Sequence, residues 1–158
     1  MEIERRFVLE EVPAVIQDLT IRAIYIVQDY LPISNPNHVV RLRRAGTKYF
    51  ITIKKAVGLS LMVREEVEVS ISEELYLKLK PCAEYGLDKW RYLVPWHDGQ
   101  CLEIDVFNKG QLVVMECEFK SVAEAECFLL PDWASNAREV TEDKRYSNRS
   151  LARLGLPN

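Results

Sequence analysis

The sequence has few of the residues on which the commonest catalytic centres depend. It contains only two histidines, both near expected turns, which argues against a histidine nucleophile relay and against a histidine-rich zinc site. Its four cysteines, Cys82, Cys101, Cys117 and Cys127, form no C-x-x-C pair and fit no zinc ribbon. We therefore expect them to be reduced and mostly buried.

Long apolar runs and an excess of positive charge are also missing. No run approaches the length of a membrane span, and the first residues, Met1–Arg6, contain no apolar signal core. The net charge of -3 and the pI of about 5.5 argue against binding of long nucleic acid, which needs an excess of positive charge on the protein surface. We expect a cytoplasmic protein that binds neither membrane nor nucleic acid, and any anion site must come from a local arrangement of charges.

The 158 residues, 48% of them hydrophobic, are enough for one domain with a real core, which we take to be residues 1–158. The dominant period is two, the period of a strand. The expected strands are residues 2–9, 21–30, 38–44, 48–55, 61–71, 89–95, 101–107, 111–120 and 138–141.

Three short turns join successive strands: Ala45-Gly46-Thr47, His97-Asp98-Gly99 and Asn108-Lys109-Gly110. Short turns make the neighbouring strands antiparallel, and a meander of about eight strands can close into a barrel. Short helices are expected at residues 11–18, 73–80, 122–130 and 147–154, the second capped by Ser72 and the third by a Ser121–Glu124 capping box. The predicted class is α+β, a closed eight-stranded antiparallel β-barrel with short helices packed outside.

Charged residues recur two apart on nearly every expected strand, with apolar residues between them. The pairs are sorted by sign: Glu2/Glu4, Glu66/Glu68, Glu103/Asp105 and Glu116/Glu118 are acidic, and Arg41/Arg43 and Lys89/Arg91 are basic. Any single pair is more simply a solvated strand face. Solvated faces usually mix signs, however, because like charges repel across neighbouring positions. If helices cover the apolar face outside, the charged face must point into the barrel.

A lumen lined by both signs predicts a ligand that carries both signs, because buried charges are costly unless they are paired. A polyanion with its divalent metal ion is such a ligand. Carboxylates without histidine or thiolate ligands favour Mg²⁺ or Mn²⁺. Arginine forks and lysine ammonium groups match phosphate oxygens.

Motifs in order along almost the whole chain resemble those of the CYTH domain, or triphosphate tunnel metalloenzyme, family, which includes class IV adenylate cyclases and thiamine triphosphatases. The chain has Glu2-Ile3-Glu4-Arg5-Arg6, where the family has E-x-E-x-K. The further motifs are Gln28-Asp29-Tyr30-Leu31, Arg41-Leu42-Arg43, Thr52-Ile53-Lys54, Arg64-Glu65-Glu66-Val67-Glu68, Lys89-Trp90-Arg91, Glu103-Ile104-Asp105, Glu116-Cys117-Glu118-Phe119 and Glu139-Val140-Thr141 with Tyr146-Ser147-Asn148.

The resemblance implies an eight-stranded tunnel and a role for each matching residue. It implies metal ligation by Glu2, Glu4, Glu66, Glu68, Glu116 and Glu118. It implies phosphate binding by Arg6, Arg41, Arg43, Lys54, Arg64, Lys89, Arg91 and Lys144. We expect Glu2, Glu4, Arg6 and Glu118 to act in catalysis, although Arg6 replaces the signature lysine and can position and neutralise without assisting a water.

These features predict a metal-dependent triphosphatase that removes the terminal phosphate of tripolyphosphate or of a related organic triphosphate such as thiamine triphosphate. The alternatives are a class IV type adenylate cyclase and a non-catalytic polyphosphate-binding module. We interpret Tyr30 and Trp90 as packing residues, and Arg145, Arg149 and Arg153 as a solvated helix face. The expected partner is a small-molecule triphosphate, and the chain is expected to be a monomer or homodimer.

Overall fold

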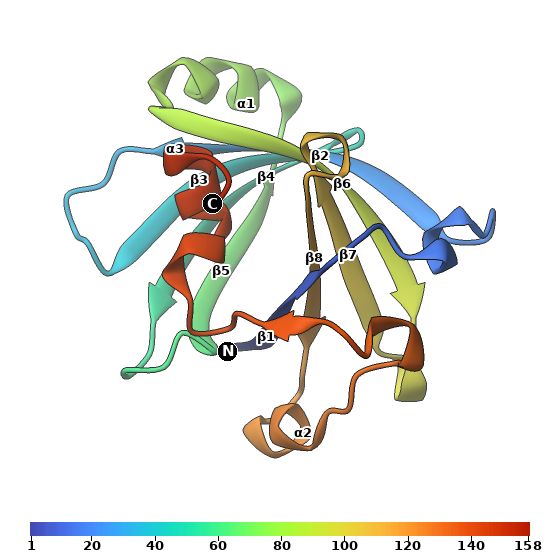
Figure 1. Ribbon diagram of the computed structural model, residues 1–158. Coiled ribbons are helices and arrows are strands. Elements are labelled where there is room, and N and C mark those ends of the chain that lie inside the picture. Colours follow the sequence, from blue (N-terminus) through green and yellow to red (C-terminus); the bar gives the residue numbers. More distant parts are fainter.

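The computed structural model describes all residues, 1–158, and its core is a closed antiparallel β-barrel (Figure 1). Nine strands form one sheet in the order β5-β4-β3-β2-β6-β7-β8-β1-β9, and a further pairing of β5 with β1 closes eight of them into the barrel. The strands are β1 (Glu2–Leu9), β2 (Arg22–Leu31), β3 (His38–Ala45), β4 (Lys48–Ala56), β5 (Val63–Ile71), β6 (Tyr85–Pro95), β7 (Cys101–Phe107), β8 (Leu112–Glu118) and β9 (Arg138–Glu139). The predicted α+β class and eight-stranded barrel are confirmed.

The three predicted hairpin turns are present. In the first, Ala45 pairs with Lys48 and the chain reverses through two residues, Gly46 and Thr47. Gly46 has a φ of 60°, which an L side chain rarely adopts and glycine adopts without strain. The other two turns lie between β6 and β7 and between β7 and β8.

The helices are shorter than the sequence predicts. They are α1 (Glu73–Leu79), α2 (Val122–Cys127) and α3 (Asn148–Leu154), with 3-10 turns η1 (Ala14–Gln17), η2 (Lys80–Cys82), η3 (His97–Gly99), η4 (Asn108–Gly110), η5 (Asp132–Ala134) and η6 (Lys144–Tyr146). The helix expected at 11–18 is wrong, because only one 3-10 turn follows Pro13. The helix expected at 122–130 ends at Cys127, where Phe128 turns to extended backbone.

Helix starts are predicted better than helix ends. The Ser72 and Ser121 hydroxyls accept hydrogen bonds from Leu75 N and Glu124 N, both at 3.1 Å. Glu124 bonds back to the backbone N–H of Lys120, one residue before the cap. None of the helices has the length and apolar composition needed to cross a bilayer.

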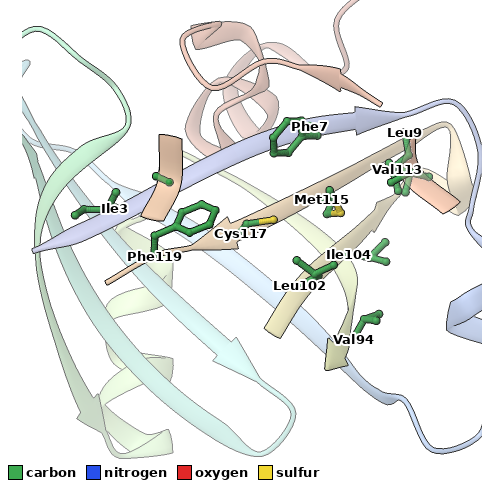
Figure 2. Close-up of a cluster of buried hydrophobic side chains, with 12 residues drawn as sticks. Ile3, Phe7, Leu9, Val94, Leu102, Ile104, Val113, Met115, Cys117 and Phe119 are labelled. Atoms are coloured by element: carbon green, nitrogen blue, oxygen red, sulfur yellow. The ribbon is translucent and has the colours of Figure 1, made fainter. Parts of the chain in front are cut away.

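The main hydrophobic core lies on the outer face of one half of the barrel (Figure 2). Its side chains alternate with the charged residues of β1, β6, β7 and β8, and α2 and η5 cover them. The labelled members are Ile3, Phe7, Leu9, Val94, Leu102, Ile104, Val113, Met115, Cys117 and Phe119. The apolar outer residues of β4 and β5 are covered less completely, since Ile53, Val67 and Val69 stay 43–61% exposed. The helices therefore cover the apolar outside only in part.

A second apolar cluster continues the inward-facing rows of β1, β6, β7 and β8 beyond their charged residues. Phe107 and Val114 lie two residues from the acidic positions Asp105 and Glu116, and they are buried. Tyr146 and Leu151, from the C-terminal segment, pack against them. The lumen is therefore apolar at the end where α3 lies and charged beyond it.

The β1–β5 junction is the least extensive strand pairing of the barrel. Only Glu2 and Ile3 pair with β5, whereas the other edge of β1 pairs with β8 from Glu4 to Leu9. Farther along, β1 pairs with β9. Near the junction, the Glu142 carboxylate accepts hydrogen bonds from Ser60 Oγ at 2.6 Å and Leu61 N at 3.0 Å, which ties the β4–β5 loop to the C-terminal segment.

Candidate active site

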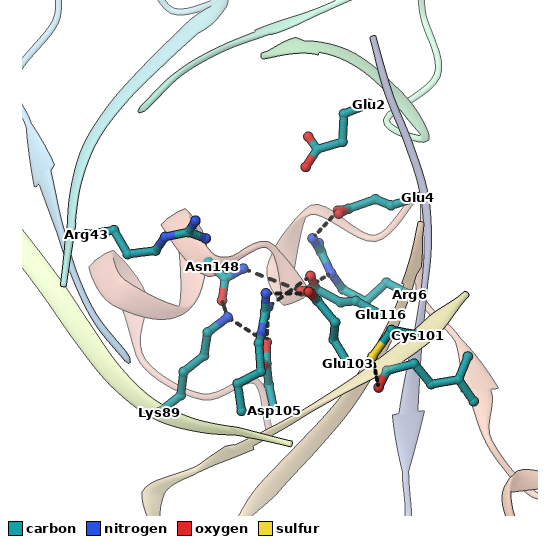
Figure 3. A network of polar contacts seen from close by, with 12 residues as sticks. Glu2, Glu4, Arg6, Arg43, Lys89, Cys101, Glu103, Asp105, Glu116 and Asn148 are labelled. Atoms are coloured by element: carbon teal, nitrogen blue, oxygen red, sulfur yellow. Dashed lines mark hydrogen bonds and ion pairs between the residues drawn. The ribbon is translucent and has the colours of Figure 1, made fainter. Parts of the chain in front are cut away.

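The charged residues of the strands point into the barrel and surround one cavity of about 780 Å³. Figure 3 shows Glu2, Glu4 and Arg6 entering from β1, with the other labelled charges converging on the same space. All but one of the predicted site residues line the cavity: Glu2, Glu4, Arg6, Arg41, Arg43, Lys54, Arg64, Glu66, Glu68, Arg91, Glu116, Glu118 and Lys144. The exception is Lys89, which points inward from β6 but has a fully buried side chain (Figure 3).

Lys89 belongs to a buried ion cluster centred on Asp105. The Lys89 ammonium donates to Asp105 Oδ2 at 2.5 Å, and Arg91 donates to both carboxylate oxygens of Asp105 at 2.7 and 2.8 Å. Arg91 also pairs with Glu103. Because Asp105 is 0% exposed, it holds two cations without reaching the cavity itself. Burial, and then the charge of Arg91, lower the pKa of Lys89 to about 8.

Glu116 joins this cluster to β1. Its carboxylate accepts from Arg6 Nε at 3.2 Å and from Arg91 Nη2 at 3.4 Å. Burial favours the neutral acid, but the charges of Arg6, Lys89 and Arg91 outweigh it and hold the pKa of Glu116 well below its usual range. Arg6 Nη2 also donates to Glu4 Oε1 at 2.6 Å. Arg6 thus bridges two carboxylates, a use suited to the fork of a guanidinium.

The opposite wall, formed by β3, β4 and β5, is paired less completely. Arg41 is 6% exposed, yet its Nη2 lies 3.8 Å from Glu66 and 3.9 Å from Glu68, beyond hydrogen-bond distance. Arg43 pairs with Glu68 at 2.9 Å, and Thr52 Oγ1 donates to the same carboxylate. The Nε atoms of Arg41 and Arg43 are buried without any partner. Unsatisfied buried donors are rare, so these two show that the protein does not fully pair the guanidinium groups of this wall.

Three carboxylates gather where β1 and β8 run side by side. Glu4 and Glu118 are paired positions of the two strands, and Glu2 precedes Glu4 on the same face. Glu2 pairs with Lys54 Nζ at 2.8 Å, whereas Glu118 makes no ion pair. Partial burial, and then the charges of Glu2 and Glu4, raise the pKa of Glu118. A bound cation would relieve this repulsion, and an all-oxygen donor set suits Mg²⁺ or Mn²⁺.

The side chains as they stand do not bring three potential metal ligands together around one point. Glu4 and Glu116 are engaged by Arg6, and Glu66 lies 3.8 Å from both Arg41 and Lys54. The unpartnered Glu118 is therefore the predicted ligand that is most available to a cation. Burial raises the pKa of Glu2, and the nearby Glu66 carboxylate adds to that effect.

The structure adds residues to which the sequence assigned no role in the site. Asp105 and Glu103 are partners of the predicted cation Arg91, and Thr52 donates to the carboxylate of Glu68. The spacing of two on a strand indicated Glu103 and Asp105 as an acidic pair, but it gave no sign of which cation they hold. Tyr30, interpreted as packing, stacks on Tyr85 and also lines the cavity, as does Gln28. Trp90 lies on the opposite face, against Tyr25.

The C-terminal segment supplies further cavity residues that no strand pattern indicates. Asn148 and Arg149 line the cavity, and Arg149 Nε donates to the Tyr85 hydroxyl at 3.0 Å. The interpretation of Arg149 as part of a solvated helix face is therefore wrong, although Arg145 and Arg153 are exposed. Lys144, which lines the cavity, is also exposed.

Comparison with known proteins gives one close sequence match of full length. The inorganic triphosphatase of Nitrosomonas europaea is 39% identical over 159 residues, which cover 99% of each chain. The chain therefore belongs to the family of that inorganic triphosphatase. No family model matches the chain.

Solved structures agree with this relationship. The crystal structure of the inorganic triphosphatase NE1496 has a TM-score of 0.66 and 36% identity, covering 100% of this chain and 97% of that chain. HpAC1 from Hippeastrum, described as an adenylyl cyclase candidate with a dominant triphosphatase activity, has a TM-score of 0.71, covering 100% of this chain and 98% of that chain. At 17% identity, the second likeness concerns the fold alone.

Proposed function

We propose that the protein is a divalent-metal-dependent inorganic triphosphatase of the CYTH, or triphosphate tunnel metalloenzyme, family. The observation that carries the proposal is a cavity lined by carboxylates and by two arginines, Arg41 and Arg43, that the protein pairs only in part and whose buried Nε atoms have no partner. A phosphate oxygen is an acceptor that fits a guanidinium donor well, and the carboxylates of the cavity leave this capacity unused. The 39% identity to an inorganic triphosphatase supports the same substrate class.

In this proposal, arginines from both sides of the cavity bind the substrate: Arg41 and Arg43 from β3, and Arg6 and Arg91 from β1 and β6. Arg41 and Arg43 donate to phosphate oxygens with the hydrogen-bonding capacity that the protein itself leaves unused. Arg6 and Arg91, held by Glu116 and Asp105, present fixed positive charge to the terminal phosphate. Arg64 and Lys144 lie on the cavity wall and add charge there. Such pre-organised charge stabilises a loose phosphoryl-transfer transition state without reorganisation.

Glu2, Glu4 and Glu118 would hold Mg²⁺ or Mn²⁺, with Glu66, Glu68 and Glu116 as further ligands or as acceptors for its bound waters. Such an ion neutralises developing charge on phosphate oxygens and lowers the pKa of water. A water held by Glu2 or Glu118 attacks the terminal phosphorus, and the bond to the bridging oxygen breaks. Tripolyphosphate and water then give pyrophosphate and orthophosphate.

An adenylate cyclase or an organic triphosphatase is the second candidate, and one observation counts against both. Tyr30 is the only aromatic side chain among the residues lining the cavity. It is 3% exposed, and its ring lies 5.5 Å from that of Tyr85, at an angle of 22°. A nucleobase or a thiamine ring therefore finds no open aromatic face on which to stack.

The experiment measures phosphate release from tripolyphosphate, ATP and thiamine triphosphate, each with Mg²⁺, with Mn²⁺ and with EDTA. We expect fast release from tripolyphosphate that requires a metal ion, with little release from the organic substrates. Equal release in EDTA would refute the metal dependence. Cyclic AMP formation from ATP without tripolyphosphate hydrolysis would favour the cyclase, and binding without turnover would favour a polyphosphate-binding module.

A further inference from the structure

Asn148 is the only residue outside the barrel strands whose side chain hydrogen-bonds to charged side chains of the lumen. It is the first residue of α3, and the preceding Ser147 caps that helix by accepting from Ser150 N at 3.1 Å. The Asn148 side chain is therefore not needed to cap its own helix. It reaches instead between β6 and β8, as Figure 3 shows.

The two neighbours of Asn148 fix the orientation of its amide. The Lys89 ammonium donates to Asn148 Oδ1 at 3.0 Å, and an ammonium can only donate. On the other side, Nδ2 donates to Glu116 Oε1, and a carboxylate can only accept. The oxygen must face Lys89 and the nitrogen must face Glu116, since the reverse orientation would lose both contacts.

The amide nitrogen keeps hydrogen-bonding capacity that the protein does not use. Its contact with Glu116 is long, at 3.5 Å, and one of its two hydrogens has no acceptor in the protein. Asn148 lines the cavity, whereas the Lys89 side chain is 0% exposed and does not. Lys89 therefore does not reach the cavity itself. It touches two residues at its edge: Asn148, which lines the cavity, and Asp105, which it shares with the lining residue Arg91.

We propose that Asn148 contacts the substrate, its Nδ2 donating to a phosphate oxygen, and that Lys89 is the positioning residue that holds the amide in that orientation. The inference rests on the proposed triphosphatase function and extends it. It also replaces the direct phosphate contact expected for Lys89 with an indirect one. A neutral donor at this point binds a phosphate oxygen without adding a third cation beside Arg6 and Arg91.

The test uses Asn148→Asp, which keeps the shape of the side chain and the oxygen that Lys89 needs. It replaces the donor with a negatively charged oxygen that faces the cavity. We expect the KM for tripolyphosphate to rise by about tenfold or more, because a hydrogen bond to a charged group is lost and a repulsion is gained. Arg153→Ala, an exposed change on the same helix, is the matched control and should leave KM unchanged.

The thermal unfolding midpoint separates a binding role from a structural one. Asn148→Asp with a near wild-type midpoint and a raised KM supports the proposal, and the same midpoint with a wild-type KM overturns it. If Asn148→Asp does not fold, Asn148→Ala decides by the same measurement: a KM raised about tenfold, with a smaller change in kcat, supports the proposal. An unchanged KM overturns it.

Wild-type protein measured alongside distinguishes this proposal from the proposed function. If the wild type releases no phosphate, the triphosphatase function is refuted by that result alone. The role of Asn148 is then judged by calorimetric binding of tripolyphosphate, which needs no turnover. Weaker binding by Asn148→Asp than by Arg153→Ala supports the contact, and equal binding overturns it.

Discussion

Two walls of the same cavity differ in how completely the protein satisfies its own charges. The packed wall consists of Arg6, Lys89, Arg91, Asp105 and Glu116, whose contacts to one another range from 2.5 to 3.4 Å. The open wall consists of Arg41, Arg43, Lys54, Glu66 and Glu68. There Arg43–Glu68 is a close pair at 2.9 Å, but Arg41 stands 3.8 and 3.9 Å from its acids.

The difference separates residues that build the site from residues that have capacity left for a ligand. A buried charge cluster is stable only when its members satisfy one another, and its geometry is then fixed before the substrate arrives. Arg41 lines the cavity with its Nη2 beyond hydrogen-bond distance of both acids, so its guanidinium keeps donors that the protein does not use. Substitutions in the packed wall should therefore lower stability, and substitutions in the open wall should lower affinity.

The largest effect is expected from Asp105→Asn in the packed wall. The change leaves Lys89 and Arg91 buried without their shared carboxylate, which should cost about 3–5 kcal/mol of unfolding free energy. The matched control is Glu103→Gln, which removes a partner of the same Arg91 but a more exposed one, and should cost about 1 kcal/mol or less. Chemical denaturation measures both, and equal losses would contradict the distinction.

Glu118→Gln tests the carboxylate group at the edge of the cavity. We expect metal-dependent turnover to fall by about a hundredfold or more, because a bound ion contributes several kcal/mol to transition-state stabilisation. Stability should not fall, since the change removes a charge that Glu2 and Glu4 repel. Turnover and the metal-induced shift in melting midpoint are the measurements. Exposed Glu65→Gln is the control, and normal turnover by Glu118→Gln would refute the metal assignment.

Arg41→Ala tests the open wall and should have a smaller effect on turnover than Glu118→Gln. Loss of one charge-assisted contact predicts a KM for tripolyphosphate raised by about tenfold to a hundredfold. The stability loss should be smaller than that of Asp105→Asn, because Arg41 has no ion pair within hydrogen-bond distance. Exposed Arg44→Ala, on the same strand but facing outward, should leave KM unchanged. Steady-state kinetics that showed the same KM for both variants would remove Arg41 from the site.

The smallest effect is a pH dependence that should come from the packed wall. Lys89 has a pKa of about 8 in the folded protein, below its ordinary value of 10.5. As the pH rises through 8, the folded protein releases this proton while the unfolded chain keeps it up to about 10.5. Burial of the charged ammonium therefore lowers stability below pH 8, and stability rises with pH between about 8 and about 10.5.

Substrate binding should change in the opposite direction. Above pH 8 a positive charge beside the cavity is lost, and the Lys89 ammonium becomes a neutral amine, a weaker donor to Asn148 Oδ1 that can also accept, so KM should rise by a few-fold. Kinetics across this pH range measure the effect. In Lys89→Arg the guanidinium stays charged, so the rise in KM should disappear. An identical rise in that variant would assign the dependence to another group.

The sequence predicted the barrel and most of the site for a physical reason that concerns single strands. A period of two places Glu2, Glu4 and Arg6 on one face and Ile3 and Phe7 on the other, whatever the partners of the strand are. It predicted helix starts because a capping hydroxyl acts within three residues. It failed for residues 11–18 and for the end of α2, where the neighbouring backbone and tertiary packing decide how far a short helix continues.

The roles of individual charges could not be predicted in the same way. The sequence predicts the same role, phosphate binding, for Lys89 and Arg91, yet only Arg91 lines the cavity. Both are buried, and which of them reaches the cavity depends on how β6 sits against β7 and on α3, whose Asn148 contacts Lys89. Asn148 stands in a motif of the sequence, but no role could be assigned to it, because its role depends on a contact between residues 59 positions apart.

By itself, the sequence determined the sign and the face of each charge, the order of the strands along the chain and the kind of ligand that such a lining suits. These properties follow from alternation along a strand and from side-chain chemistry, which are local. The tertiary structure alone decided which cations are already neutralised by Asp105 and Glu116, and which, like Arg41, have no close partner in the protein. That division depends on distances between strands, because electrostatic pairing and burial are set by the three-dimensional approach of the groups and not by their spacing along the chain.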